Sequence, residues 1–218
     1  MIPTQPLPAK QPPKNDSLLI SYMTLRKSVG WLGIVLPIVL VTGSLLLDHS
    51  NQILVSLSAY YYTCSRNALI GILCAVSLFL FCYRGYDRQD SIVSNLAGLF
   101  ALGVAFFPTS DTDEKSDLIS TLHYVFAGIF FTLLSYMSIF LFTKTSGFVT
   151  PQKKERNAVY VVCGIIMISC SAAIPLDSIP AIHDRIGFLK PTLIFETGAL
   201  WAFGVSWLTK GEFILKDK

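Results

Sequence analysis

Two ionisable side chains, Glu196 and His123, lie inside long apolar stretches of the sequence. Glu196 is the only acidic residue clearly within such a stretch, and a helix that starts at Thr192 would carry it roughly 6 Å along its axis. His123 lies near the start of another stretch that is expected to begin on the same side. Ionisable groups at membrane depth are costly and usually face a partner or a cavity. We therefore expect these candidate catalytic residues to face each other in an outward-opening cavity; the alternative is that each reaches headgroups and water independently.

A metal site is a second hypothesis for the same side of the membrane. Zinc takes histidine and carboxylate ligands, and the residues of these types expected there include His123, Glu196, His183, His49, Asp111 and Asp177. No pair of them has the HxxxH or HExxH spacing of a metal motif. A haem held by two histidines would need ligands that face each other across the bundle. The sequence therefore predicts no cofactor, with zinc at His123, Glu196, His183 and Asp177 as the alternative.

Other chemical motifs are missing from the sequence. It has no Gly-rich phosphate loop and no GxSxG nucleophile elbow. The acidic stretch Asp111–Glu114 lacks the spacing of a calcium loop and is expected to be a solvated turn. The five cysteines form no CxxC pair, and they are expected to be free packing residues. No block of Lys and Arg suits nucleic acid, so the expected partners are membrane lipids.

The elements that position these residues follow from the composition. Of 218 residues, 52% are hydrophobic and 14% are charged, where soluble domains carry about 25% charge. The mean hydropathy is +0.56. Six apolar runs are long enough to span a bilayer as helices, near residues 29–47, 67–83, 91–107, 119–142, 157–175 and 192–208. The sequence thus predicts an all-α integral membrane bundle of six spans.

Loop charges predict the orientation of this bundle. With six spans, 13 of the 17 Lys and Arg residues fall on the side that holds both termini. Basic residues mark the cytoplasmic side, so both termini are expected to be cytoplasmic. The predicted organisation is a Pro-rich disordered tail with an interfacial lead-in at 1–27, a membrane domain at 28–210 and a short cytoplasmic tail at 211–218. Within the first of these segments, the lead-in is expected at residues 18–25.

The hairpin of the third and fourth runs has a distinctive small-residue face. Ser94 and Gly98 are four residues apart, as are Ala97, Ala101 and Ala105. Small residues let helices approach closely in lipid. We expect this face to pack against neighbouring helices.

Three segments carry a resemblance to a known family: SAYYYTCSRNALIGILCAVSLFLFCYRGYD, NLAGLFALGVAFFPT and ETGALWAFGVSWLTKG. They resemble uncharacterised bacterial membrane proteins near the domain-of-unknown-function 998 family. The resemblance implies a six-span protein of the bacterial cytoplasmic (inner) membrane and implies no activity. A more distant comparison is with the seven-span hydrolases that include alkaline ceramidases. Those carry an HxxxH in the last span, where this chain has Glu196 and no histidine.

Two classes of function therefore remain open. The first is a small-solute or proton pathway, or a sensory or structural membrane component. The alternative is a metal-dependent membrane hydrolase with an outward-facing site.

Overall fold

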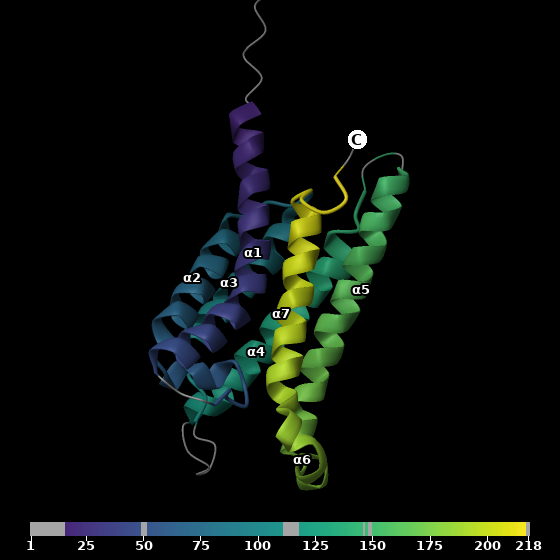
Figure 1. Cartoon of the computed structure of the whole chain (residues 1–218). Coiled ribbons are helices and arrows are strands. Elements are labelled where there is room, and N and C mark those ends of the chain that lie inside the picture. Colours follow the sequence, from purple (N-terminus) through teal and green to yellow (C-terminus); the bar gives the residue numbers. More distant parts are fainter. Residues whose placement is uncertain (1–15, 49–51, 111–117, 146, 148–149, 217–218) are drawn as a thin grey trace, which may run out of the picture.

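The chain folds into a bundle of long helices, as a computed structural model shows (Figure 1). The structure describes residues 16–48, 52–110, 118–145, 147 and 150–216, and no strand occurs among them. The helices are α1 (Asp16–Leu47), α2 (Arg66–Cys82), α3 (Arg88–Phe106), α4 (Leu118–Tyr136), α5 (Pro151–Ala173), α6 (Pro180–Ile186) and α7 (Pro191–Lys210). The predicted all-helical class is thus confirmed.

Short helical turns join or extend these helices. They are the 3-10 turns η1 (Ser58–Tyr62), η3 (Ile174–Ser178) and η4 (Gly187–Leu189), and the π-turn η2 (Met137–Leu141) that continues α4. α7 packs between α1 and α5, and α3 packs between α2 and α4. The described part of the chain begins and ends at the same end of the bundle, while α6 lies at the opposite end (Figure 1).

Each of the six apolar runs lies largely within one of the long helices. Four stretches are long and apolar enough to cross a membrane: Tyr22–Leu47, Arg88–Phe106, Leu118–Leu141 and Pro151–Ser178. α2 is also apolar but has 17 residues, and α7 has 20 residues with Glu196 among them. The expected lead-in at residues 18–25 belongs to α1, and residues 1–15 lie outside the described part of the chain. The fold is therefore all-helical, with four stretches that are long and apolar enough to cross a membrane.

The small-residue face of α3 is a packing surface, as predicted. Ser94, Ala97, Ala101 and Ala105 are fully buried, and Gly98 is buried with them. A side chain at Gly98 would meet Phe81 and the carbonyl oxygen of Ser77 at 3.0 Å. The hydroxyl of Ser77 donates to the carbonyl of Gly98 at 2.7 Å. α2 and α3 therefore meet backbone to backbone at this level.

A second close approach joins the first and last helices. A Cβ placed on Gly30 would lie 2.8 Å from the carbonyl oxygen of Gly204, and one on Gly204 would lie 2.7 Å from the carbonyl oxygen of Gly30. Only glycine fits at both positions, because any side chain would force the two backbones apart. This contact fixes α7, the helix that carries Glu196, against α1.

An ion-pair clamp closes the end of the bundle opposite α6. The ammonium of Lys144, in the loop after η2, lies 2.8 Å from Asp87 and 2.7 Å from the fully buried Asp90. Asp87 caps α3 by accepting a hydrogen bond from the Asp90 amide at 3.1 Å. The hydrogen bond from Lys144 lowers the pKa of Asp87, and the two carboxylates raise the pKa of Lys144. The clamp thus ties the start of α3 to the end of the α4–η2 helix.

Candidate functional site

The loop before η1 is fastened to the start of α7, and this contact places η1 beside Glu196. The amide of Leu193 donates to the carbonyl of Val55 at 3.0 Å. The ammonium of Lys190 donates to the carbonyl of Ile53. Since both bonds join loop backbone to the first turn of α7, the position of Ser58 at the start of η1 is set by a helix that follows it by more than a hundred residues.

Glu196 binds this loop through both carboxylate oxygens. Oε2 accepts a hydrogen bond from the backbone amide of Leu57. Oε1 lies 3.3 Å from Oγ of Ser58. The carboxylate therefore satisfies a backbone donor that would otherwise be left without a partner at the edge of the bundle.

Ser58 also contacts His123, so that one hydroxyl joins the two predicted residues. Oγ of Ser58 lies 2.9 Å from Nε2 of His123. The other ring nitrogen, Nδ1, lies 2.6 Å from the carbonyl oxygen of Phe107, directly after α3. The imidazole is 4% exposed and packs edge-on against the ring of Tyr124. His123 is thus held at both nitrogens in a single orientation.

A cavity of about 880 Å³ opens beside this hydrogen-bonded chain. Its walls come from α4, the end of α5, η3, α6 and α7, and its polar and aromatic lining includes His123, Tyr124, Phe131, Asp177, His183, Asp184, Thr192 and Glu196. Ser58 is not among the described residues of the wall. No Lys or Arg belongs to the described lining either. The described wall of the cavity is therefore acidic.

The candidate metal ligands divide into two groups on this cavity. Asp177 accepts from Thr192 at 2.8 Å and contacts Nδ1 of His183 at 3.1 Å. Glu196 and His123 form the other group, bridged by Ser58. Within the described ranges, no three His, Cys, Asp or Glu side chains gather closely enough to hold a metal ion. His49 and Asp111 lie outside the described residues.

The geometry of Ser58 and His123 differs from that of a hydrolytic triad. In a triad, the acid orients the histidine and the serine faces the substrate. Here the carbonyl of Phe107 orients His123, and the acid Glu196 contacts the serine instead. Since Ser58 is also not among the residues that line the cavity, this arrangement suits proton transfer along the chain better than attack by the serine.

Sequence reasoning did not find Ser58 or the carbonyl of Phe107. Ser58 is 65 residues from His123 and 138 from Glu196. Serine is common, and no local spacing signals a contact over such separations. One local signal was available: two ionisable residues within apolar runs, predicted to lie on one side of the membrane, need a polar partner, and the loop between the first two runs is one place that offers hydroxyls.

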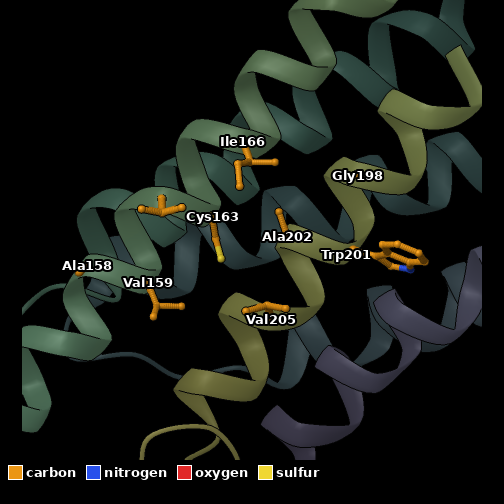
Figure 2. Close-up of a pocket in the computed structure, with 9 residues that line it drawn as sticks. Ala158, Val159, Cys163, Ile166, Gly198, Trp201, Ala202 and Val205 are labelled. Atoms are coloured by element: carbon orange, nitrogen blue, oxygen red, sulfur yellow. The ribbon is translucent and has the colours of Figure 1, made fainter. Parts of the chain in front are cut away.

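A second cavity, of about 530 Å³, is an apolar groove between α5 and α7 (Figure 2). Its lining is Ala158, Val159, Val162, Cys163, Ile166, Gly198, Trp201, Ala202 and Val205. The indole of Trp201 donates to the carbonyl of Ile34 on α1 at 3.2 Å. The five cysteines of the chain are free, and Cys163 is buried in the wall of this groove. The groove suits lipid contact and offers no acid–base chemistry.

No protein-family model, curated protein or solved structure matches this chain. The resemblance to the domain-of-unknown-function 998 family therefore stays a prediction. The functional argument for this helical chain rests on the geometry of its site.

Proposed function

We propose that this chain is a six-span protein of the bacterial cytoplasmic membrane, with both termini inside, that binds a small positively charged solute in its outward-facing cavity. The topology is supported by six long helices that run along one axis and by the excess of Lys and Arg in alternate loops (Figure 1). With that orientation, the end that holds α6 and the cavity faces outward.

The acidity of the cavity is the observation that carries the proposal. Asp177, Asp184 and Glu196 line it, and no basic side chain belongs to its described wall apart from two histidines. A concave surface of one charge sign concentrates ions of the opposite sign. The rings of Tyr124 and Phe131 on the same wall suit an organic cation, because the face of an aromatic ring attracts positive charge.

The size of the cavity agrees with a small ligand. Small-molecule sites occupy roughly 300–1,000 Å³, and this cavity has about 880 Å³. We therefore favour a solute with an amine or quaternary ammonium group over a bare metal ion.

Thermal unfolding of the purified protein in detergent tests this function. Tetramethylammonium and ethylammonium chloride should raise the midpoint of unfolding in a concentration-dependent way, because a ligand that binds only the folded state stabilises it. Sodium acetate, matched in ionic strength, should not. Equal shifts with acetate, or none with either cation, would contradict the proposal.

Two variants sharpen this test. Asp184→Asn removes an exposed carboxylate from the wall, and Gly128→Leu adds bulk to the cavity at a position where a Cβ meets no atom within 4 Å. Both should reduce the stabilisation by cations. The matched controls are Glu155→Gln, an exposed carboxylate at the other end of α5, and Gly71→Leu on α2, which also meets no atom within 4 Å.

The metal-dependent hydrolase is the second candidate, since its four predicted ligands line one cavity. Elemental analysis of the purified protein separates the two functions. We expect zinc well below one ion per chain, because the two groups of ligands are not gathered at one point. Stoichiometric zinc that is lost in His123→Ala and in Glu196→Gln would favour the hydrolase.

A further inference from the structure

We propose that Glu196, Ser58 and His123 form a relay that holds one shared proton, and that a cation entering the cavity displaces this proton. The first part follows from the hydrogen bonds alone. The second part rests on the proposed function.

The number of hydrogens in the relay follows from its contacts. A backbone carbonyl only accepts, so Nδ1 of His123 must carry a hydrogen toward Phe107. Nε2 and the carboxylate of Glu196 then both face Oγ of Ser58, which has a single hydrogen to donate. One of these two contacts lacks a hydrogen unless one more proton sits on Glu196 or on His123.

With that proton, two arrangements satisfy every contact. In the first, protonated Glu196 donates to Ser58, and Ser58 donates to neutral His123. In the second, cationic His123 donates from Nε2 to Ser58, and Ser58 donates to the Glu196 carboxylate. To change from the first to the second, Glu196 transfers its proton to Oγ of Ser58, and Ser58 transfers its original proton to Nε2 of His123. The O–H bond of Glu196 and the original O–H bond of Ser58 break, while a new O–H bond of Ser58 and an N–H bond of His123 form. The atoms, the protons and the total charge are the same in both.

The charge of the relay explains why a cation would replace the proton. With the shared proton the relay is neutral overall, and without it the relay carries one negative charge. An unpaired charge at membrane depth is costly, so the proton leaves readily only when another positive charge takes its place. Glu196 and His123 both line the cavity, which gives a solute cation direct access to the charged ends of the relay.

Other charged and titratable groups surround the relay without joining it. Asp177, His183 and Asp184 share the cavity from η3 and α6. Lys190 is bound to the carbonyl of Ile53, and the hydroxyl of Tyr60 accepts from the amide of Leu54. Tyr124 contacts the imidazole through its ring. A variant at Ser58 leaves all of these in place, which makes Ser58 the position at which to test the relay.

Infrared difference spectroscopy of the wild-type protein without ligand tests the shared proton. The carbonyl stretch of protonated Glu196 should be present in the wild type at neutral pH and should be missing in Glu196→Gln. Ser58→Ala should shift this band, because the acid loses its hydrogen-bond partner. Ser58→Thr keeps the hydroxyl and should restore the wild-type band. Thermal unfolding of each variant verifies that it is folded.

The matched control is Ser171→Ala. Ser171 also lines the cavity, but its hydroxyl donates to the carbonyl of Met167 on its own helix, so its loss should leave the band unchanged. A band that is the same in Ser58→Ala as in the wild type would overturn the relay.

Proton release on addition of tetramethylammonium tests the displacement. In weakly buffered solution with a pH dye, the wild type should release up to one proton per chain, and Ser58→Ala should release less. Stabilisation by the cation with no proton release would overturn the displacement and leave the proposed function standing. A Ser58-dependent band with no cation binding would contradict the proposed function and leave the shared proton standing.

Discussion

At the scale of single residues, Glu196 has a structural role in addition to its ionisable group, because it fixes the loop before η1. Its carboxylate accepts the backbone amide of Leu57, on a segment far away in the sequence. Glu196→Gln keeps a carbonyl oxygen for this amide, whereas Glu196→Leu keeps none. Leaving a buried donor without a partner costs about 1–3 kcal/mol. We therefore expect Glu196→Leu to lower the free energy of unfolding by that amount relative to Glu196→Gln, as measured by denaturant unfolding in detergent.

The two variants also separate the roles of this residue. Glu196→Gln should fold nearly as well as the wild type but lose the acid band and the proton release. If both variants were equally stable, the hydrogen bond to Leu57 would not contribute to the stability of the fold.

Sequence reasoning found half of the site. Glu196 and His123 stood out because ionisable residues are rare inside apolar runs, and the structure places them around one hydroxyl on one cavity. Ser58 could not be found in the same way, because its position depends on bonds between a loop and the start of α7. Contacts of this kind join segments that are far apart in the sequence, and no local sequence pattern shows that these segments are neighbours in the fold.

At the scale of helices, the close contact between α2 and α3 depends on Gly98. A leucine at this position would collide with Phe81 and with the backbone of Ser77. Overpacking of this kind costs about 1–3 kcal/mol. Gly98→Leu should therefore lower the unfolding midpoint of the purified protein. Gly71→Leu, on the open face of α2, should leave that midpoint nearly unchanged; an equal loss in both would contradict the packing role of Gly98.

The clamp of Lys144 with Asp87 and Asp90 makes the stability of the α3 start depend on pH. The pKa of Asp87 is lower in the folded state, so its contribution is complete above the ordinary carboxyl pKa of about 4 and is lost as the pH falls through the lowered value. The pKa of Lys144 is raised, so its contribution is complete below the ordinary lysine value of about 10.4 and is lost as the pH rises through the raised one.

Acid unfolding measures the first of these effects. As the pH falls below about 5, the unfolding midpoint of the wild type should fall more steeply than that of Asp87→Asn. The difference between the two curves isolates Asp87 from the other carboxylates. Parallel curves would show that the ion pair does not contribute to stability.

Helix positions were predicted better than helix ends. The apolar runs located all six long helices, since burial in lipid demands length and hydrophobicity. The residues expected to form a lead-in at 18–25 instead continue α1 without a break, because nothing in that stretch interrupts helical hydrogen bonding. The π-turn after α4 has no sequence signature at all, and it depends on tertiary contacts such as the hydrogen bond of Ser138 with Ser206 at 2.7 Å.

At the scale of the whole molecule, native cysteines provide a test of the proposed orientation. Cys64 is exposed beside η1, at the end that holds the cavity, and Cys82 is exposed at the opposite end of α2. In intact spheroplasts, a membrane-impermeant maleimide should label Cys64 and spare Cys82. Permeabilised cells should then allow labelling of both.

Replacing each of these cysteines by serine shows which residue is responsible for the maleimide labelling. Cys64→Ser should abolish labelling in intact spheroplasts, and Cys82→Ser should leave it unchanged. Labelling of Cys82 with protection of Cys64 would reverse the orientation and place the cavity on the cytoplasmic side.

The glycine contact between α1 and α7 has a consequence for biogenesis. Helices enter a membrane in the order in which they are synthesised. Here the last long helix, α7, must pack against the first, α1. Until α7 arrives, the loop around Ser58 lacks the Glu196 carboxylate that it binds. The proposed binding site is thus the final part of the protein to be assembled, and a ribosome that stops before α7 releases a chain with five of its long helices and without Glu196.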